Sequence, residues 1–231
     1  TDWGKKGWFY RADLIIDIIA DEKPGVIGFQ EATKWHYSYL VDSLKGYDSV
    51  ITYRDDAFNS EGCPIFYNTE LYTLVDKGSF WLSETPDVPS KSWGAQYNRV
   101  CSYVILTEKA TKQDFVVFNT HLSHVSDEAR INGIGVVLDK IAEFGSLPSV
   151  IMGDSVSNMG KNVFNKCISL RHVTLSNALT YIAESTFDRC SSLVNITIPP
   201  SIKEIKARVF NDCSSLDSII LPNVEVIGVE A

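Results

Sequence analysis

The sequence lacks several features that would define its class at once. Its 231 residues contain no run of 18 or more apolar residues, which excludes a membrane-spanning helix. The 21 Lys and Arg side chains are outnumbered by 29 Asp and Glu, so the chain has no broad cationic field of the kind that attracts long nucleic acid. No basic segment followed by an apolar one opens the sequence, and no signal peptide is expected in it. The five cysteines are odd in number, and their pattern predicts no disulfide framework.

The composition changes near residue 154. All five Trp and nine of the ten Tyr precede residue 104. Residues 1–154 carry the whole net charge of −8, whereas residues 155–231 contain seven basic and seven acidic side chains. We therefore predict two domains, residues 1–154 and residues 155–231.

The second predicted domain is a tandem repeat. Phe164, Phe187 and Phe210 follow one another at steps of 23 residues. Four more columns keep that step: Cys167, Cys190 and Cys213; Leu170, Leu193 and Leu216; Val173, Ile196 and Ile219; Leu175, Ile198 and Leu221. A unit of this length cannot bury its apolar side alone, so neighbouring units stack into a solenoid around one shared core.

The cysteine column has two interpretations, a metal or disulfide site and a structural ladder. No His column or second Cys column accompanies it, as a metal site would need. We therefore expect the three thiols to be small buried side chains in stacked coils.

The repeat motif resembles a known class. Its form, Phe187-x-x-Cys190-x-x-Leu193-x-x-Ile196-x-Ile198-Pro199, resembles the bacterial surface-antigen class of leucine-rich repeats. The resemblance implies an extended surface for a protein partner and an extracellular or cell-surface location, as for a secreted protein.

The first predicted domain alternates helices and strands. Helices are expected over 11–22, 33–45 and 127–144, and strands near 26–29, 48–53, 65–67, 71–76, 100–106, 115–118 and 149–152. The inward sides are expected to be Leu14, Ile15, Ile18 and Ile19 in the first helix and Ile131, Ile134, Leu138 and Ile141 in the third.

Polar groups terminate or precede four of these strands. They are Glu31, Glu61, His121 and Asp154. Taken singly, each is more often a solvated turn residue or a structural histidine. Taken together, carboxylates and an imidazole at converging strand ends suit a hard divalent cation, which prefers oxygen ligands. Such an ion polarises a phosphoryl oxygen, so the pattern favours hydrolysis of phosphate esters.

Several motifs in residues 1–154 resemble the endonuclease/exonuclease/phosphatase family, in particular its bacterial branch. They are Gln30-Glu31, Pro64-Ile65-Phe66-Tyr67, the run from Gly78 to Pro86, Trp93, Arg99, Asn119-Thr120-His121-Leu122-Ser123-His124, Ala129-Arg130 and Gly153-Asp154. The Phe-Trp-Leu-Ser-Glu-Thr-Pro part of the run is the most specific of them. The resemblance implies an α/β fold: a four-layer α/β/β/α sandwich, partial here, followed by the leucine-rich-repeat solenoid.

The resemblance also implies roles for individual residues. Glu31 would bind the catalytic Mg²⁺ or Mn²⁺, and His121 would hold the scissile phosphate. Glu61 would orient the site or the phosphate-binding histidine, and Asp154 would position or activate the attacking water. The further phosphate or substrate contacts would be Arg99, Asn119, His124 and Arg130. For Arg130 a salt bridge on the helix surface is an equally good interpretation.

The sequence departs from the family pattern in ways that matter for catalysis. The family's Gly-Asp-Phe-Asn becomes Gly153-Asp154-Ser155-Val156, so the Asn is replaced by Val156. The terminal Asp-His pair and the first strand of the family are absent from the sequence, as if truncated at both ends. Loss of a general base alone lowers rates about 10²- to 10⁴-fold, so we expect impaired turnover. Nothing in the sequence indicates whether the repeats continue the incomplete sheet.

Three functional hypotheses follow. The first is a metal-dependent phosphoester hydrolase, phosphodiesterase-like or phosphatase-like, impaired in this chain. The second is an inactive surface module that binds protein through its repeats. The third is a chimera of two unrelated segments, suggested by the abrupt change of register at Asp154/Ser155 without a flexible linker. The charge of −8 favours a small phosphoester as substrate and disfavours long nucleic acid.

Overall fold

The computed structural model describes residues 7–145, 147–154, 161, 164–168, 170–175 and 179–231. Its elements, in chain order, are α1 (Trp8–Glu22), β1 (Val26–Gly28), β2 (Ala32–Thr33), α2 (Lys34–Ser43), β3 (Tyr47–Val50), β4 (Glu61–Gly62), β5 (Ile65–Asn68), β6 (Tyr72–Trp81), β7 (Val100–Glu108), β8 (Asp114–His121), α3 (Asp127–Glu143), β9 (Ser149–Asp154), β10 (Leu170–Thr174), β11 (Tyr181–Ile182), β12 (Asn195–Thr197), β13 (Glu204–Ile205) and β14 (Val226–Ile227).

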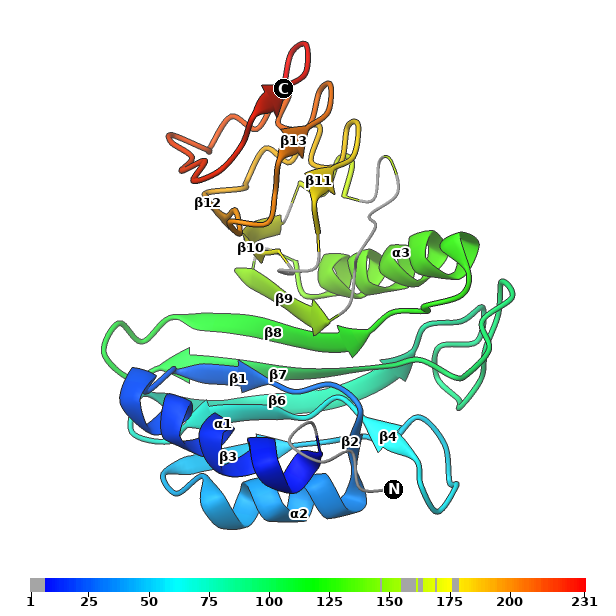
Figure 1. Ribbon diagram of the computed structural model, residues 1–231, viewed down its shortest axis with the longest axis vertical. Helices are drawn as coiled ribbons and strands as arrows, with labels where there is room; N and C mark the ends of the chain where they lie inside the picture. The colour runs from blue at the N-terminus through cyan, green and yellow to red at the C-terminus, as the bar shows by residue number, and fades with distance from the viewer. Residues whose placement is uncertain (1–6, 146, 155–160, 162–163, 169, 176–178) are drawn as a thin grey trace.

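Two sheets and three helices form the layers of the first part (Figure 1). The sheet β1-β5-β3 is covered by α1 and α2, with Ile19, Leu40 and Phe66 buried between them. Ile65 and Val104 are buried between this sheet and the second one. Helix α3 covers the far face of the second sheet through an apolar cluster that includes its buried Val137 and Ile141. The predicted four-layer α/β/β/α arrangement is confirmed.

Two helices begin at side-chain caps that the sequence supplies. In α2 the Thr33 hydroxyl accepts from the backbone N–H of His36, and the His36 imidazole accepts from the backbone N–H of Thr33. In α3 the Ser126 hydroxyl accepts from the backbone N–H of Ala129 at 3.1 Å. These caps fix where each helix starts relative to the strand before it.

The predicted inward faces were partly wrong. Leu14 and Ile18 are 59% and 52% exposed, while Ala12 and Ile19 of the same helix are buried. In α3, Ile131 is 45% exposed, although Ile134 and Ile141 are buried as expected. Apolar residues surround more than one side of α1, so periodicity alone did not determine which side packs against the sheet.

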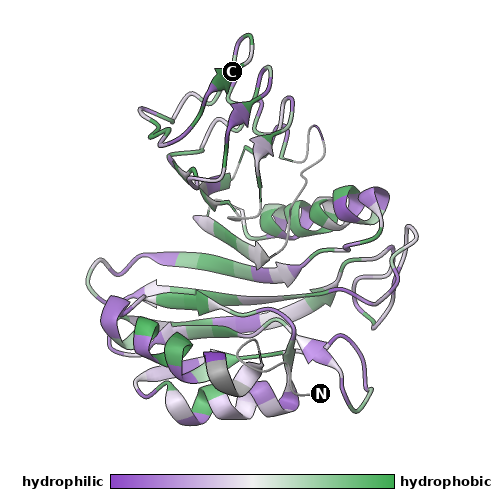
Figure 2. Cartoon of the chain, in the orientation of Figure 1, coloured by the Kyte–Doolittle hydropathy of each residue, from purple (hydrophilic) through white to green (hydrophobic). Residues whose placement is uncertain are grey.

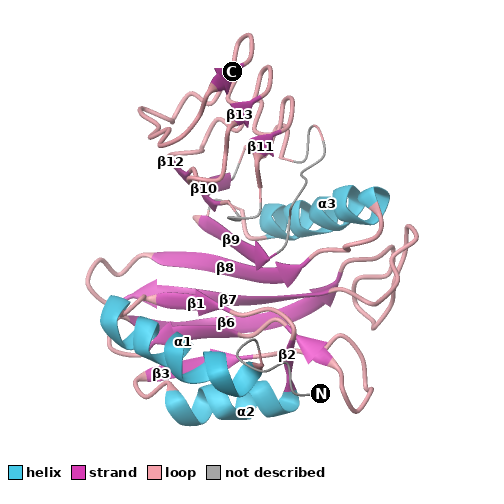
Figure 3. Ribbon diagram, viewed as in Figure 1, coloured by secondary structure: helices cyan, strands magenta, loops and turns pink. Residues whose placement is uncertain are grey.

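The second sheet runs without interruption from the first part of the chain into the repeats (Figure 3). Its six strands lie in the order β12-β10-β9-β8-β7-β6. Strand β9 is parallel to both neighbours, β8 on one side and β10 on the other. Phe118, Ile151, Val173 and Ile196 pair in one row across four strands. The repeats therefore cover the edge of β9, which would otherwise be open.

The hydrophobic core is continuous across the same junction. Leu122, Leu138 and Ile151 pack both against the cluster beneath α3 and against the core of the repeats. Buried Ile134 of α3 belongs to the repeat core itself. Figure 2 shows apolar residues on α3 and β9, next to the first repeat strands. Helix α3 thus covers the first coil, which a solenoid needs because its end coil otherwise exposes apolar surface.

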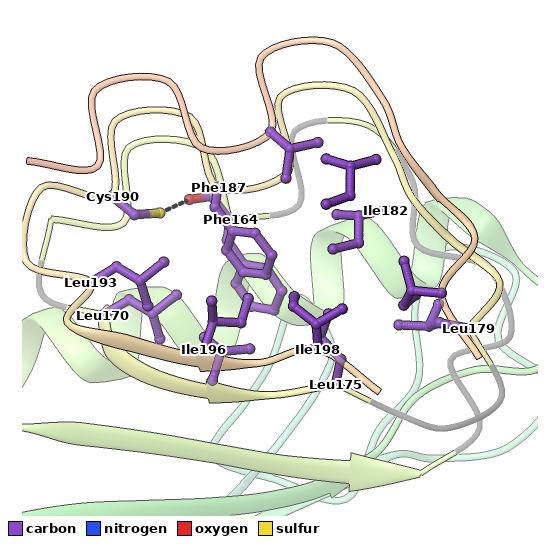
Figure 4. Close-up of a cluster of buried hydrophobic side chains, with 14 of the residues drawn as sticks. Phe164, Leu170, Leu175, Leu179, Ile182, Phe187, Cys190, Leu193, Ile196 and Ile198 are labelled. Carbon is purple, nitrogen blue, oxygen red and sulfur yellow. Dashed lines mark hydrogen bonds between the residues drawn. The ribbon is translucent and has the colours of Figure 1, made fainter. Parts of the chain in front are cut away.

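The repeats stack through their phenylalanines (Figure 4). The rings of Phe164 and Phe187 are 5.1 Å apart at 3° to each other, and those of Phe187 and Phe210 are 5.7 Å apart at 1°. Phe187, in the middle, has no exposed surface. The phenylalanines that repeat at steps of 23 residues in the sequence therefore stack on one another in the structure.

The cysteine column also joins neighbouring coils. All five cysteines are free thiols. The Cys190 thiol donates to the Phe164 carbonyl oxygen at 2.9 Å (Figure 4), and the Cys213 thiol donates to the Phe187 carbonyl oxygen at 3.1 Å. Each thiol thus satisfies a carbonyl of the coil before it, which fits the structural interpretation of this column.

Candidate functional site

A narrow pocket collects polar residues from several strand ends and loops. Its lining consists of Glu31, Arg54, Glu61, Gly62, Cys63, Asn98, Arg99, Val100 and His121. Four residues selected from the sequence, Glu31, Glu61, Arg99 and His121, therefore lie together although up to 90 residues separate them in the chain.

Glu31 enters the pocket just after β1 in a strained backbone conformation. Its φ is +56°, in the left-handed region that non-glycine residues seldom adopt. Such conformations cost about 1–3 kcal/mol and concentrate at functional sites. The Glu31 side chain is 62% exposed, and its Oε1 lies 3.6 Å from His121 Nδ1. The carboxylate is therefore open to a ligand from the solvent side.

Two histidines lie on either side of one buried arginine. Arg99, which is 7% exposed, contacts His121 Nδ1 through Nη1 at 3.2 Å and His124 Nδ1 through Nη2 at 2.9 Å. The His124 ring in turn stacks on Tyr97, with 6.3 Å between the centroids. Arg99 thereby contacts both imidazoles, that of His121 at the end of β8 and that of His124 in the turn after it.

Glu61 is paired with a residue that the sequence analysis did not select. Arg54 donates from Nη1 to Glu61 Oε2 at 2.6 Å. Its guanidinium lies over the Tyr97 ring, 4.7 Å from the centroid. Arg54 sits in an irregular loop after β3, where no periodic pattern exists, so sequence reasoning had no signal for it. The role expected for Glu61, orienting the site or the phosphate-binding His121, stays a prediction.

Asn119 connects the two sheets from a fully buried position. Its Nδ2 donates to the Phe29 and Pro64 carbonyl oxygens at 2.9 and 2.8 Å, and its Oδ1 accepts from Gln30 at 2.7 Å. Its exposed fraction is 0%. These bonds fix the β1 end, and with it Glu31, against β8. Asn119 therefore positions the pocket and does not line it.

We expect Asn119→Ala to lower the free energy of unfolding by about 1–3 kcal/mol. The Phe29 carbonyl oxygen loses its side-chain donor, Gln30 Nε2 loses its acceptor, and the Pro64 carbonyl oxygen keeps only the Phe29 N–H. Urea denaturation followed by circular dichroism measures the change. The exposed Asn195→Ala is the matched control and should stay within about 0.5 kcal/mol of the wild type. Equal stability of the two variants would contradict the bridging role.

Arg130 lies on α3 outside the pocket lining. Its guanidinium contacts Asp127, one turn earlier, and donates to the Ser123 carbonyl oxygen at 2.6 Å. Of the two interpretations drawn from the sequence, this geometry favours the helix-surface salt bridge, and Arg130 also holds the turn that follows His121.

The backbone of Asp154 ends β9 directly beside His121. The two residues pair across β8 and β9. The Asp154 side chain lies outside the described part of the structure, as do Ser155 and Val156. The strand pairing nevertheless brings the Asp154 backbone to the same sheet edge as the pocket.

Burial governs the protonation of two pocket groups. It raises the pKa of the Cys63 thiol to about 12, so Cys63 is protonated at neutral pH and is a poor nucleophile. Burial, followed by the charge of Arg54, lowers the pKa of Arg99 from its ordinary value. The effect of Arg54 on the pKa of Arg99 arises because the two guanidinium charges lie near each other in the pocket.

The donor set of the pocket fits a hydrated divalent cation held by few protein ligands. Among the described residues no group of three or more His, Cys, Asp and Glu side chains is arranged to enclose a metal ion. Mg²⁺ commonly keeps several waters and uses only one or two carboxylates. Glu31 offers one exposed carboxylate, while Glu61 is already bound to Arg54. The pocket thus suits a water-rich ion on Glu31 better than a closed cage.

Both parts of the chain are similar to known proteins. Residues 142–231 match the family described as BspA type leucine rich repeat region. The mannosyl-6-phosphatase of Bacteroides thetaiotaomicron has a similar structure, with a TM-score of 0.61 and 37% identity over 64% of this chain and 57% of that chain. The chain therefore has an endonuclease/exonuclease/phosphatase-type fold, and its residues 142–231 are similar to BspA-type leucine-rich repeats.

Two further relatives support this result. An endonuclease/exonuclease/phosphatase protein from Bacteroides vulgatus superimposes with a TM-score of 0.63 and 34% identity, covering 65% of this chain and 59% of that one. Protein L388 of Acanthamoeba polyphaga mimivirus is 34% identical in an alignment of 122 positions that covers 49% of this chain and 46% of that protein. The chain spans between 46% and 59% of the length of these relatives.

The leucine-rich-repeat match begins upstream of the compositional change. It starts at residue 142, near the end of α3, and includes β9. Strand β9 therefore belongs to both patterns: it pairs with β8 of the endonuclease/exonuclease/phosphatase fold and with β10 of the repeats. No helix within the described residues combines the length and apolarity needed to cross a membrane.

Proposed function

We propose that this chain is a metal-dependent phosphoester hydrolase that acts slowly on a small phosphate ester. The observation that carries the proposal is the pocket in which Glu31, Arg99 and His121 are linked by contacts of 3.6 and 3.2 Å. The relatives support it, because one of them is named a mannosyl-6-phosphatase. A phosphomonoester of a sugar or another small alcohol is the proposed substrate class.

The pocket residues would divide the work as follows. Glu31 would hold the Mg²⁺ or Mn²⁺ ion, which when bound supplies charge stabilisation to a phosphoryl oxygen and lowers the pKa of water. His121 would donate to a phosphate oxygen, and Arg99 would keep the His121 ring in place through its contact with Nδ1. Glu61 would keep Arg54 oriented, and Asp154 would position the attacking water. Slow turnover is proposed because Val156 replaces the family's asparagine.

The proposal is tested with 4-nitrophenyl phosphate in the presence and absence of Mg²⁺ or Mn²⁺. Release of 4-nitrophenol should require the metal and should fall to the chelator background in Glu31→Gln, because the replaced carboxylate no longer binds the cation. Hydrolysis that continues in EDTA, or that Glu31→Gln leaves unchanged, would contradict it. Glu70→Gln, at an exposed turn after β5, is the matched control.

The repeats carry a second proposed role, binding of a protein partner at the cell surface or outside the cell. Ile220 and Val229 in the last coils are 82% and 77% exposed, so these coils present apolar side chains that a protein partner could cover. The surface location and the protein partner are predictions drawn from the repeat class. The domain boundary between residues 154 and 155 and the origin as a chimera also stay predictions.

A further inference from the structure

Arg54 is held more firmly than a surface loop residue needs to be. Its Nη1 donates to Glu61 at 2.6 Å, and its guanidinium lies 4.7 Å from the centre of the Tyr97 ring. Its carbonyl oxygen accepts from Trp81 Nε1 at 2.9 Å and from Asn98 Nδ2 at 3.2 Å. Backbone and side chain are thus both fixed, so the guanidinium has one orientation at the pocket wall before any ligand binds.

The pocket holds a second guanidinium whose charge acts on the first. Arg54 and Arg99 both line it. In each, the buried Nε atom has no hydrogen-bond partner within the described part of the chain, although Asp55 Oδ2 lies 3.8 Å from Arg54 Nε. Two like charges in a poorly solvated pocket repel each other, and a buried donor without a hydrogen bond is destabilising. Both costs fall when an anion binds between the two side chains.

The charge of the pocket indicates which anion. The described charged side chains of its lining are two carboxylates, Glu31 and Glu61, and two guanidiniums, Arg54 and Arg99. These four charges balance, so a divalent cation on Glu31 would add positive charge to the pocket lining. A phosphate monoester near neutral pH carries up to two negative charges, whereas a diester carries one. The two guanidiniums and the cation therefore favour the dianionic monoester over the monoanionic diester.

We propose that Arg54 and Arg99 form a paired phosphate-binding site that makes the pocket select phosphate monoesters over diesters. This inference rests on the proposed function and adds to it the residues that select the substrate class. Arg54 binds the third non-bridging oxygen of the monoester, which in a diester is an esterified oxygen. Glu61 and Tyr97 orient the Arg54 guanidinium for that contact. Arg99 binds from the opposite side while it holds the two histidines.

The test compares 4-nitrophenyl phosphate with bis(4-nitrophenyl) phosphate in the wild type, Arg54→Gln, Arg54→Lys and the control Arg171→Gln. Arg171 is exposed on β10, so its variant removes the same charge away from the pocket. We expect Arg54→Gln to lower kcat/KM for the monoester about 10- to 100-fold, mostly through KM, and that for the diester by less than about threefold. Arg54→Lys should recover part of the loss, since it restores charge without the planar fork.

Equal losses for the two substrates in Arg54→Gln would overturn the inference, because a merely structural arginine affects both alike. No loss for either would overturn it as well. A second measurement, calorimetric titration of inorganic phosphate in the presence of Mg²⁺, does not need turnover. The wild type and Arg171→Gln should bind phosphate at least about tenfold more tightly than Arg54→Gln.

The two measurements separate the failures. If the wild type hydrolyses the monoester and Arg54→Gln behaves the same, the inference alone is wrong. If the wild type binds phosphate but hydrolyses neither ester, the proposed function fails, while weaker binding by Arg54→Gln still supports the paired site. If the wild type neither binds phosphate nor hydrolyses either ester, both fail.

Discussion

His121→Ala is expected to lower metal-dependent kcat/KM for 4-nitrophenyl phosphate by about 10²- to 10³-fold, the usual cost of removing one donor to developing negative charge. His121 is 8% exposed, lies at the end of β8 and joins Glu31 to Arg99. Its removal takes away a phosphate donor and one of the two imidazoles that Arg99 holds. Initial rates at several substrate and Mg²⁺ concentrations measure the effect.

His36→Gln is the matched control for this variant. His36 completes the cap of α2, and Gln at the same position can accept from the same backbone N–H. His36 does not line the pocket, although it is hydrogen-bonded to the backbone of Glu31, a bond that the Gln amide can also make. The control should keep wild-type rates. Similar rate losses in both variants would mean that the His121 effect comes from general destabilisation, and no loss in His121→Ala would remove His121 from the proposed mechanism.

Phe187→Ala is expected to lower the free energy of unfolding by about 3–5 kcal/mol, as large-to-small changes of buried aromatic residues do. Phe187 is fully buried between Phe164 and Phe210. Its effect should spread beyond the repeats, because the sheet and the core continue into the first part of the chain. The expected result is one cooperative transition that shifts as a whole.

Tryptophan fluorescence provides a local probe for this prediction. All five Trp lie within residues 1–93, so their emission reports only on the part outside the repeats, whereas circular dichroism reports on the whole chain. Both urea midpoints should fall together in Phe187→Ala. Ile220→Ala, at a position that is 82% exposed, should move neither. A shift in circular dichroism without a shift in fluorescence would show that the two parts unfold independently.

Some parts of this structure could be predicted from the sequence because one local pattern determines each of them. The step of 23 residues places Phe164, Phe187 and Phe210 in one stack, since equivalent positions of stacked coils superimpose. Glu31 and His121 could be placed together because each stands at the end of an apolar strand, and these two strands, one in each sheet, end at the same pocket. The Ser126 cap of α3 was equally visible.

Other parts depended on contacts that no local pattern encodes. Arg54 reaches the pocket from an irregular loop, and its partners Glu61 and Tyr97 come from other segments. The pairing of β9 with both β8 and the repeat strand β10 could not be predicted from the sequence, for a geometric reason. Ser149 pairs with Leu170 at an offset of 21 residues, and Ile151 pairs with Val173 at an offset of 22, since the register shifts between Leu170 and His172. Neither offset equals the repeat step of 23. The repeat frame therefore seemed to begin after Asp154, although the sheet passes through the junction.

Native-state hydrogen exchange at β9 tests most directly whether the two parts form one structure. With β8 on one side and β10 on the other, the amides of Val150, Ile151 and Met152 lie inside a six-stranded sheet. They should exchange as slowly as those of Val116–Phe118 in β8, through the same global opening. Fast exchange of β9 amides beside slow exchange in β8 would make β9 an edge strand and contradict the account.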